Sequence, residues 1–226
     1  MTISILQSNY IPWKGYFDII AKSDVFVLYD EVQYTKNDWR NRNIIFCQQK
    51  PTWLTIPVKQ DNLTQLICDT KIATNNWNRK HMNSILLNYR KSRGFDYFED
   101  ELSTMYDFSS EYLSEINAHF IKTICRLLNI KTKIIDSREL NLQGDRNEKL
   151  VDACQKLSAT HYLSGPAAKS YLNVDLFNQS GIQLRWMDYS DYSAYQQSSH
   201  VFSHQVSIID LMLNVGAEAR SYINLT

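Results

Sequence analysis

Two short apolar runs, separated by a helical pattern, constrain the fold of this chain more than any other feature. Residues 2–7 and 25–29 are rich in β-branched and aromatic side chains, which predicts two buried strands. Between them, residues 14–22 place Phe17 and Ile20 near one face of a helix. A strand, a helix and a second strand this close together form a βαβ unit with parallel strands and a right-handed crossover. We therefore expect an α/β fold in which this N-terminal βαβ unit belongs to a largely parallel central sheet flanked by helices.

The rest of the chain is expected to add a small hairpin, a helical middle segment and further strands. Residues 43–48 and 52–58 predict hairpin strands joined by Gln49-Lys50-Pro51, and residues 66–73 predict another strand. Helices are expected over residues 77–91, 95–106, 110–128 and 148–157, and strands at residues 131–135, 161–163 and 183–187. A last helix is expected to begin near Ser207 and to end at Gly216. No internal repeat or low-complexity linker divides the sequence, so we expect a single domain over residues 1–226.

The charge balance and the cysteine content exclude several classes of protein. The 24 Lys and Arg residues balance 24 Asp and Glu residues without a long basic run, which disfavours nucleic acid as the main partner. The four cysteines show no CxxC spacing, and His200 and His204 lack a nearby acidic ligand, so neither a disulfide framework nor a metal site is expected. No run approaches the ~20 apolar residues of a membrane span, and the N-terminus lacks the charged start of a signal peptide. A cytoplasmic protein without a cofactor is therefore expected.

Polar side chains follow each of the first two predicted strands, where α/β proteins usually hold a ligand. Asp30 directly follows the second strand, and a carboxylate there could take a proton from an attacking amine or hold a sugar hydroxyl. An N-cap or a buried salt bridge to Arg40 or Arg42 is the structural alternative for Asp30. Gln33 could donate a hydrogen bond to a developing oxyanion. Asp30 and Gln33 are therefore the candidate catalytic residues.

The same part of the chain offers most of the candidate binding residues. Arg42 suits a diphosphate because its planar guanidinium can bind two oxygens at once, although polar loops also need internal hydrogen bonds. Aromatic rings here could stack on a base or a sugar, whereas packing in the core is the alternative for each of them. The candidates are Gln7, Tyr10, Trp13, Tyr34, Lys36, Trp39, Asn41 and Arg42.

Further candidate binding residues lie late in the chain. Ser164 and Gly165 follow a short predicted strand and precede a predicted helix, so their backbone amides could cradle a phosphate. Lys169 would add a positive charge if its side chain turned towards this loop. An ordinary strand-to-helix turn has the same sequence pattern. Asp210 lies in an otherwise apolar helix and is expected to face a polar pocket.

Six sequence blocks resemble the WbqC-like family. They are QxNYIPWKGYFD at residues 7–18, DEVQY at 30–34, WRNRN at 39–43, WLTIPV at 53–58, YLSGPAAKSYL at 162–172 and SIIDLMLNVG at 207–216. Ser8 and His204 depart from prolines that are more usual in the family. The resemblance implies a role in bacterial O-antigen or other surface-polysaccharide biosynthesis, and it suggests a glycine or aminoacyl transferase that acylates an amino sugar. The sugar is expected to be nucleotide-linked, and the acyl donor and the oligomeric state stay open.

Two other functions are also open. A non-catalytic protein that binds a sugar nucleotide or scaffolds the pathway would use the same residues. The second open function is a nucleotide-dependent ligase or nucleotidyltransferase. Nucleotidyltransferases with an HxGH motif after their first strand have the same order of strand, turn and helix as the start of this chain. Here Trp13-Lys14-Gly15-Tyr16 stands at the position of that motif, so both histidines of that mechanism are absent.

Overall fold

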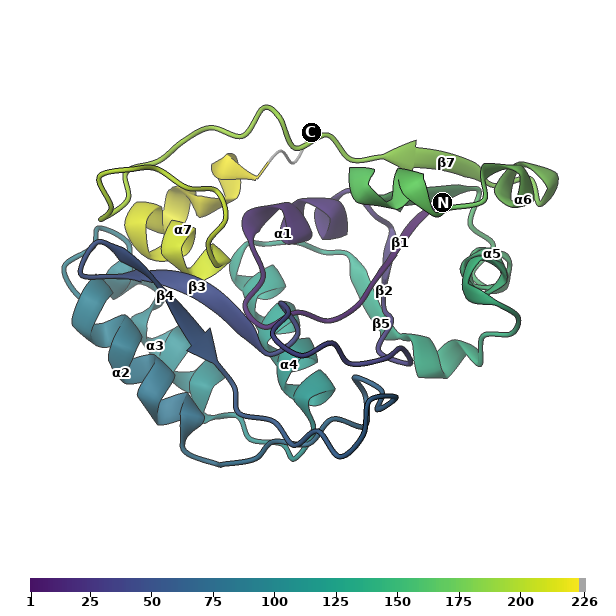
Figure 1. Ribbon diagram of the computed structural model, residues 1–226. Helices are drawn as coiled ribbons and strands as arrows, with labels where there is room; N and C mark the ends of the chain where they lie inside the picture. The colour runs from purple at the N-terminus through teal and green to yellow at the C-terminus, as the bar shows by residue number, and fades with distance from the viewer. Residues whose placement is uncertain (224–226) are drawn as a thin grey trace.

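A five-stranded parallel sheet forms the centre of the computed structural model, which describes residues 1–223 (Figure 1). The strand order is β5-β2-β1-β6-β7, and every pairing in this sheet is parallel. The strands are β1 (Thr2–Leu6), β2 (Val25–Leu28), β5 (Lys133–Asp136), β6 (His161–Ser164) and β7 (Gln183–Trp186). The predicted α/β class, the N-terminal βαβ unit and the largely parallel sheet are confirmed.

Helices cover both faces of the sheet because the strands alternate apolar side chains between two faces. On β2, Phe26 and Leu28 belong to one buried cluster, whereas Val25 and Val27 belong to another. The first cluster contains side chains of helices α1 (Lys14–Ala21) and α4 (Leu113–Leu127). The second contains side chains of helices α5 (Arg146–Lys156) and α6 (Val174–Gln179). The sheet is therefore the middle layer of an α/β/α arrangement.

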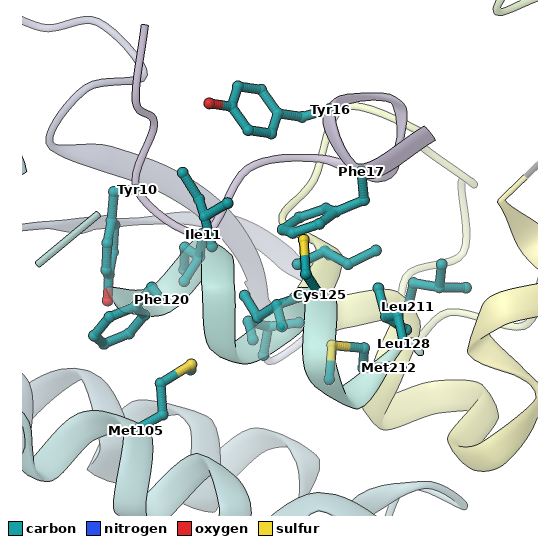
Figure 2. Close-up of a cluster of buried hydrophobic side chains, with 14 of the residues drawn as sticks. Tyr10, Ile11, Tyr16, Phe17, Met105, Phe120, Cys125, Leu128, Leu211 and Met212 are labelled. Atoms are coloured by element: carbon teal, nitrogen blue, oxygen red, sulfur yellow. The ribbon is translucent and has the colours of Figure 1, made fainter. Parts of the chain in front are cut away.

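The chain between β2 and α4 builds a second group of elements beside the sheet. It contains a hairpin of β3 (Arg42–Cys47) and β4 (Lys50–Thr55), followed by helices α2 (Trp77–Tyr89) and α3 (Phe95–Asp107). Helix α7 (Ile208–Val215) contacts both α3 and β3, on the left in Figure 1. Figure 2 shows side chains from α1, α3, α4 and α7 in one buried cluster. The buried cluster that contains side chains of α1 and α4 thus continues into this second group of elements.

The hairpin, one predicted strand and one helix differ from expectation. The hairpin turns at Gln48 and Gln49, both with positive φ, so Lys50 and Pro51 belong to β4 and not to the loop. Residues 66–73 form no strand and make only isolated bridges, such as Gln33 with Leu66. The side chains of Ile67, Cys68 and Ile72 are buried, although the segment has no neighbouring strand to pair with. The helix expected after Ser164 is a short 3₁₀ helix, η2 (Pro166–Ser170), and α6 was not predicted.

The ends of the last helix follow the sequence signals. The Ser207 side chain accepts a hydrogen bond from Ile209 N at the start of α7, and Gly216 takes φ +66° just after its end. The remaining 3₁₀ helices are η1 (Ser137–Leu140) and η3 (Gly216–Tyr222). Within residues 1–223, no helix combines the length and the apolar character needed to cross a membrane.

The strand order creates a switch point next to β1. The chain passes from β1 to β2 and then β5 on one side, and later to β6 and β7 on the other. Loops that leave the carboxyl ends of β1 and β6 therefore diverge, and open α/β sheets bind ligands in the crevice at such a point.

Candidate functional site

A cavity of about 880 Å³ lies at the carboxyl end of the sheet, where the switch point predicts a ligand site. Leu6 and Gln7 at the end of β1 and Tyr162 of β6 line it. The first turn of α5 and the segment after β2 also line it. A volume of this size is within the range of small-molecule and cofactor sites.

Positive charge exceeds negative charge in the cavity wall. Arg40, Arg146 and Lys149 line it, against the carboxylates of Glu31 and Asp145. Within the described chain, Arg146 and Lys149 form no salt bridge, and the Arg146 guanidinium carbon lies 3.9 Å from the centre of the Tyr171 ring. Two cations are therefore free to meet an anionic ligand.

The start of α5 offers these two cations to a ligand in the cavity, whereas the side-chain cap of the helix uses its backbone amides at Asn147 and Glu148. The Asp145 carboxylate accepts hydrogen bonds from Asn147 N (2.8 Å) and Glu148 N (2.9 Å), which completes a capping box. Because the cap occupies these amides, an anion at this end of the cavity would be held by the side chains of Arg146 and Lys149.

Arg40 is held in place from two sides. Its guanidinium donates to the amide oxygen of Asn9 and lies 3.6 Å from an Asp38 carboxylate oxygen. Asn117 Nδ2 donates to the Arg40 carbonyl at 2.8 Å, so the backbone is fixed as well. The third cation of the cavity is therefore positioned before any ligand arrives.

Aromatic rings form much of the remaining wall. Trp13 packs edge to face on Tyr189 with 5.0 Å between ring centres, and both line the cavity. A side chain at Gly15 would overlap the Trp13 indole, so glycine lets this ring fold over the first turn of α1. The Tyr16 hydroxyl donates to the Gln7 carbonyl at 2.9 Å, which fixes the loop after β1. The rings offer flat apolar surface for a base or a sugar.

Asp30 lies behind the cavity wall and does not line it. It is 4% exposed, and its Oδ1 accepts a hydrogen bond from Ser8 N at 2.8 Å. Burial raises the pKa of this carboxyl to about 6. By holding Ser8, Asp30 orients Gln7 and Asn9, which both line the cavity. The next residue, Glu31, does line the wall, and its Oε2 accepts from the Ser137 hydroxyl at 2.8 Å.

Four residues expected at the site from sequence do line the cavity. They are Gln7, Trp13, Gln33 and Trp39. The Gln33 side chain also donates to the Leu63 carbonyl.

Three other expected site residues are buried in the core. Tyr10 is fully buried, and its hydroxyl hydrogen bonds with His81 Nδ1 and with the Tyr106 hydroxyl, both at 2.8 Å. Figure 2 shows Tyr10 beside Phe120. Tyr34 is 2% exposed, and Asn41 donates to the Ile56 carbonyl at 2.8 Å. These contacts match the structural alternative of packing and internal hydrogen bonding.

Lys36 and Arg42 lie outside the cavity wall. Lys36 is exposed. Arg42 donates to the Asn37 carbonyl, and its guanidinium carbon lies 4.2 Å from the centre of the Trp53 ring.

The candidates late in the chain do not join the cavity either. Ser164 is buried, Gly165 lies outside the wall, and Lys169 Nζ stands 5.6 Å from the Trp186 ring. Asp210 is fully buried, and its carboxylate accepts from Tyr89 (2.6 Å), Tyr195 (2.7 Å) and Gln197 (2.9 Å). Asp210 therefore connects core elements instead of facing an open pocket.

Several residues of the cavity were not predicted. They are Asn9, Tyr16, Tyr29, Glu31, Arg40, Arg146, Lys149, Tyr162, Tyr171 and Tyr189. Arg40 belongs to the same WRNRN block as three of the candidates, and Asp145 with Glu148 has capping-box spacing that marks the start of α5. Tyr171 lies in the YLSGPAAKSYL block, whereas nothing local to Tyr189 indicates a role at this site. Within residues 1–223, no three His, Cys, Asp or Glu side chains cluster as a metal site.

Comparison of the sequence with known proteins finds a matching family and a similar protein. The model of the WbqC-like protein family matches residues 7–222. The chain is 40% identical over 223 residues to a protein of Mycobacterium tuberculosis described as uncharacterized protein Rv1507c, covering 98% of this chain and 96% of that protein. No solved structure matches the chain. The family match over nearly the whole length, together with this relative, shows that the chain belongs to the WbqC-like protein family.

Proposed function

We propose that the cavity binds a nucleotide-linked amino sugar and that the protein transfers a glycyl or other aminoacyl group to it during synthesis of a bacterial surface polysaccharide. The observation that carries this proposal is the combination of three cations and several aromatic rings in one cavity at the switch point of the sheet. The likeness of the sequence blocks to the WbqC-like family supports the process and the type of reaction.

The charges and rings of the cavity suit the two ends of such a substrate. Arg146 and Lys149 are unpaired with any described carboxylate, and they suit the two phosphates of a nucleoside diphosphate. Trp13 and Tyr189 offer ring edges and faces against which a base can pack. An amine of the sugar attacks the acyl carbonyl, a C–N bond forms, and the bond to the donor's leaving group breaks. The amine proton passes to a carboxylate of the wall, and Glu31 is the one for this role because the cap of α5 occupies the Asp145 carboxylate.

The first test is binding. Isothermal titration calorimetry with UDP-glucosamine should detect binding to the wild-type protein. An Arg146→Gln/Lys149→Gln variant should bind at least about tenfold more weakly, since a hydrogen bond to a charged group is worth ~1.5–3 kcal/mol. Lys169→Gln removes an exposed cation outside the cavity and is the matched control, with no expected change. Equal binding by all three proteins would place the ligand elsewhere.

The second test is turnover. Mass spectrometry of the sugar after incubation with glycyl-tRNA, an aminoacyl thioester, or glycine and ATP should show acylation of the amine with one of these donors. Glu31→Gln should lose turnover and keep binding. Asp30→Asn tests the role expected from sequence, and loss of turnover there with intact binding would return the proton transfer to Asp30.

A ligase or nucleotidyltransferase is the main alternative, and the switch-point cavity is equally able to hold ATP. It predicts release of pyrophosphate from ATP in the presence of an amino acid. Lys14 would not contact phosphates in that case, because its Nζ donates to the Ser193 carbonyl at 3.0 Å and it does not line the cavity. Binding without turnover under any of these conditions would favour the non-catalytic alternative.

A further inference from the structure

A pair of exposed tryptophans lies beside the cavity, one in the segment before β3 (Trp39) and one on β4 (Trp53). The ring centres of Trp39 and Trp53 are 5.3 Å apart, and their planes are inclined by 41°. The two side chains are 40% and 43% exposed. Trp39 also lines the cavity, so the pair continues the cavity wall onto the hairpin. Clustered apolar surface of this kind is typical of a place where a ligand or partner binds.

The backbone that carries Trp39 is anchored to the core. Its carbonyl accepts a hydrogen bond from Tyr10 N at 3.0 Å, and Tyr10 is fully buried. Its own N–H donates to Asp38 Oδ1 at 2.7 Å. The backbone position of Trp39 is therefore fixed before binding, which lowers the entropy cost of using this residue as a contact.

Trp53 is presented outward by the alternation of β4. Its neighbour Leu54 is 4% exposed and packs in the core, so Trp53 faces the opposite side of the hairpin. The Arg42 guanidinium lies 4.2 Å from the Trp53 ring centre and is itself held by the Asn37 carbonyl. A cation and an exposed ring thus stand together at the edge of the pair.

We propose that Trp39 and Trp53 form a platform for the sugar ring of the substrate, an inference that rests on the function proposed above. The C–H groups of a pyranose ring carry partial positive charge and pack on the negative faces of aromatic rings. Planes inclined by 41° leave no parallel slot for a flat base, whereas a puckered sugar has C–H groups in several directions. The hydroxyl groups of the sugar would remain at the rim, near the polar groups of Arg42 and Gln33.

The arrangement of charge orients the substrate. Arg146 and Lys149 come from α5, and Figure 1 shows α5 and the β3–β4 hairpin on opposite sides of β1 and β2. A nucleotide sugar therefore has its phosphates towards α5 and its sugar towards the hairpin. The reacting amine of the sugar lies between them, on the side of the cavity that contains Glu31 and Gln33.

The test uses Trp53→Ala, because Trp53 lies outside the cavity wall and its removal leaves the nucleotide contacts in place. Tyr97→Ala is the matched control, since Tyr97 is another exposed aromatic residue, on α3. The titrated compounds are UDP, UDP-glucosamine and the free glucosamine disaccharide. We expect Trp53→Ala to weaken binding of UDP-glucosamine about three- to tenfold and to leave the affinity for UDP unchanged. Tyr97→Ala should change neither, and thermal unfolding of both variants checks that they are folded.

Three results would overturn the platform. An unchanged affinity of Trp53→Ala for UDP-glucosamine shows that the pair does not touch the sugar. An equal loss for UDP and UDP-glucosamine shows that the pair holds the nucleotide. If the wild-type protein binds neither UDP nor UDP-glucosamine, the proposed function fails. Titration of the glucosamine disaccharide then tests the platform independently of that function. Binding of the disaccharide that Trp53→Ala abolishes supports the platform, and absence of that binding refutes it.

Discussion

The buried carboxyl of Asp30 should make the stability of this protein depend on pH between about 4 and 6. Burial raises its pKa from an ordinary value of 3.8 to about 6 in the folded protein. In this range the folded protein keeps a proton on Asp30 that the unfolded chain has released. The free energy of unfolding therefore falls as the pH rises through this window. A difference of about two pKa units corresponds to about 3 kcal/mol, present in full below pH 4 and lost above pH 6.

Asp30→Asn isolates this contribution. The asparagine side chain has nearly the same shape and does not titrate, and its oxygen can still accept the hydrogen bond from Ser8 N. Urea unfolding followed by tryptophan fluorescence, at several values between pH 4 and pH 7, gives the free energy of unfolding of both proteins. We expect the free energy of unfolding of the variant, relative to that of the wild type, to rise by about 3 kcal/mol from pH 4 to pH 7. Other titrating groups cancel in the difference.

A difference that stays constant with pH would refute the reasoning, since it would mean that Asp30 has the same pKa in both states. A shift in the opposite direction would mean that Arg40 or the Ser8 amide stabilises the charge more than burial opposes it.

Three further predictions follow from buried contacts, each measured by urea unfolding. Asp210→Ala should destabilise the protein by about 3–5 kcal/mol, because the buried donors of Tyr89, Tyr195 and Gln197 lose their shared acceptor. Tyr195→Phe removes only one of these donors and should cost about 1–3 kcal/mol. Equal effects of the two substitutions would contradict a network centred on Asp210. Gly94→Ala should lower the free energy of unfolding more than Gly181→Ala does. A Cβ at Gly94 overlaps backbone atoms of α7 and Gly216, whereas a Cβ at Gly181 meets no atom and only the φ of +72° opposes it, at about 1–2 kcal/mol. Tyr10→Phe should cost about 1–2 kcal/mol and leave UDP-glucosamine binding unchanged, and weaker binding would return Tyr10 to the site.

Local patterns in the sequence predicted most helices and strands well. β1, α1 and β2 appear where periodicity placed them, because burial on one or both faces imposes a regular spacing of apolar residues. The hairpin turn was misplaced because Gln48 and Gln49 adopt the left-handed conformation that usually marks glycine or asparagine. Residues 66–73 were misassigned because an apolar run signals burial, and burial does not require a paired strand.

The candidate site was predicted only in part, for a similar reason. Gln7, Trp13, Gln33 and Trp39 were found because they lie in the polar and aromatic segments that follow β1 and β2. Tyr10 and Tyr34 are aromatic residues in the same blocks as Trp13 and Gln33, yet they face the core. Sequence cannot separate these cases, because one rotation of a loop residue exchanges a cavity-facing ring for a core ring.

The sequence by itself determined the α/β class, the parallel βαβ start, the family and the segment that supplies one half of the cavity. Only the tertiary structure decided which polar groups meet there. Arg146 and Lys149 line the same cavity as Gln7 because the order of the strands brings the loop before α5 back beside the end of β1. That order depends on the packing of helices on both faces of the sheet, and such packing joins residues far apart along the chain. Local spacing carries no record of those contacts, so the charge of the cavity became visible only with the fold.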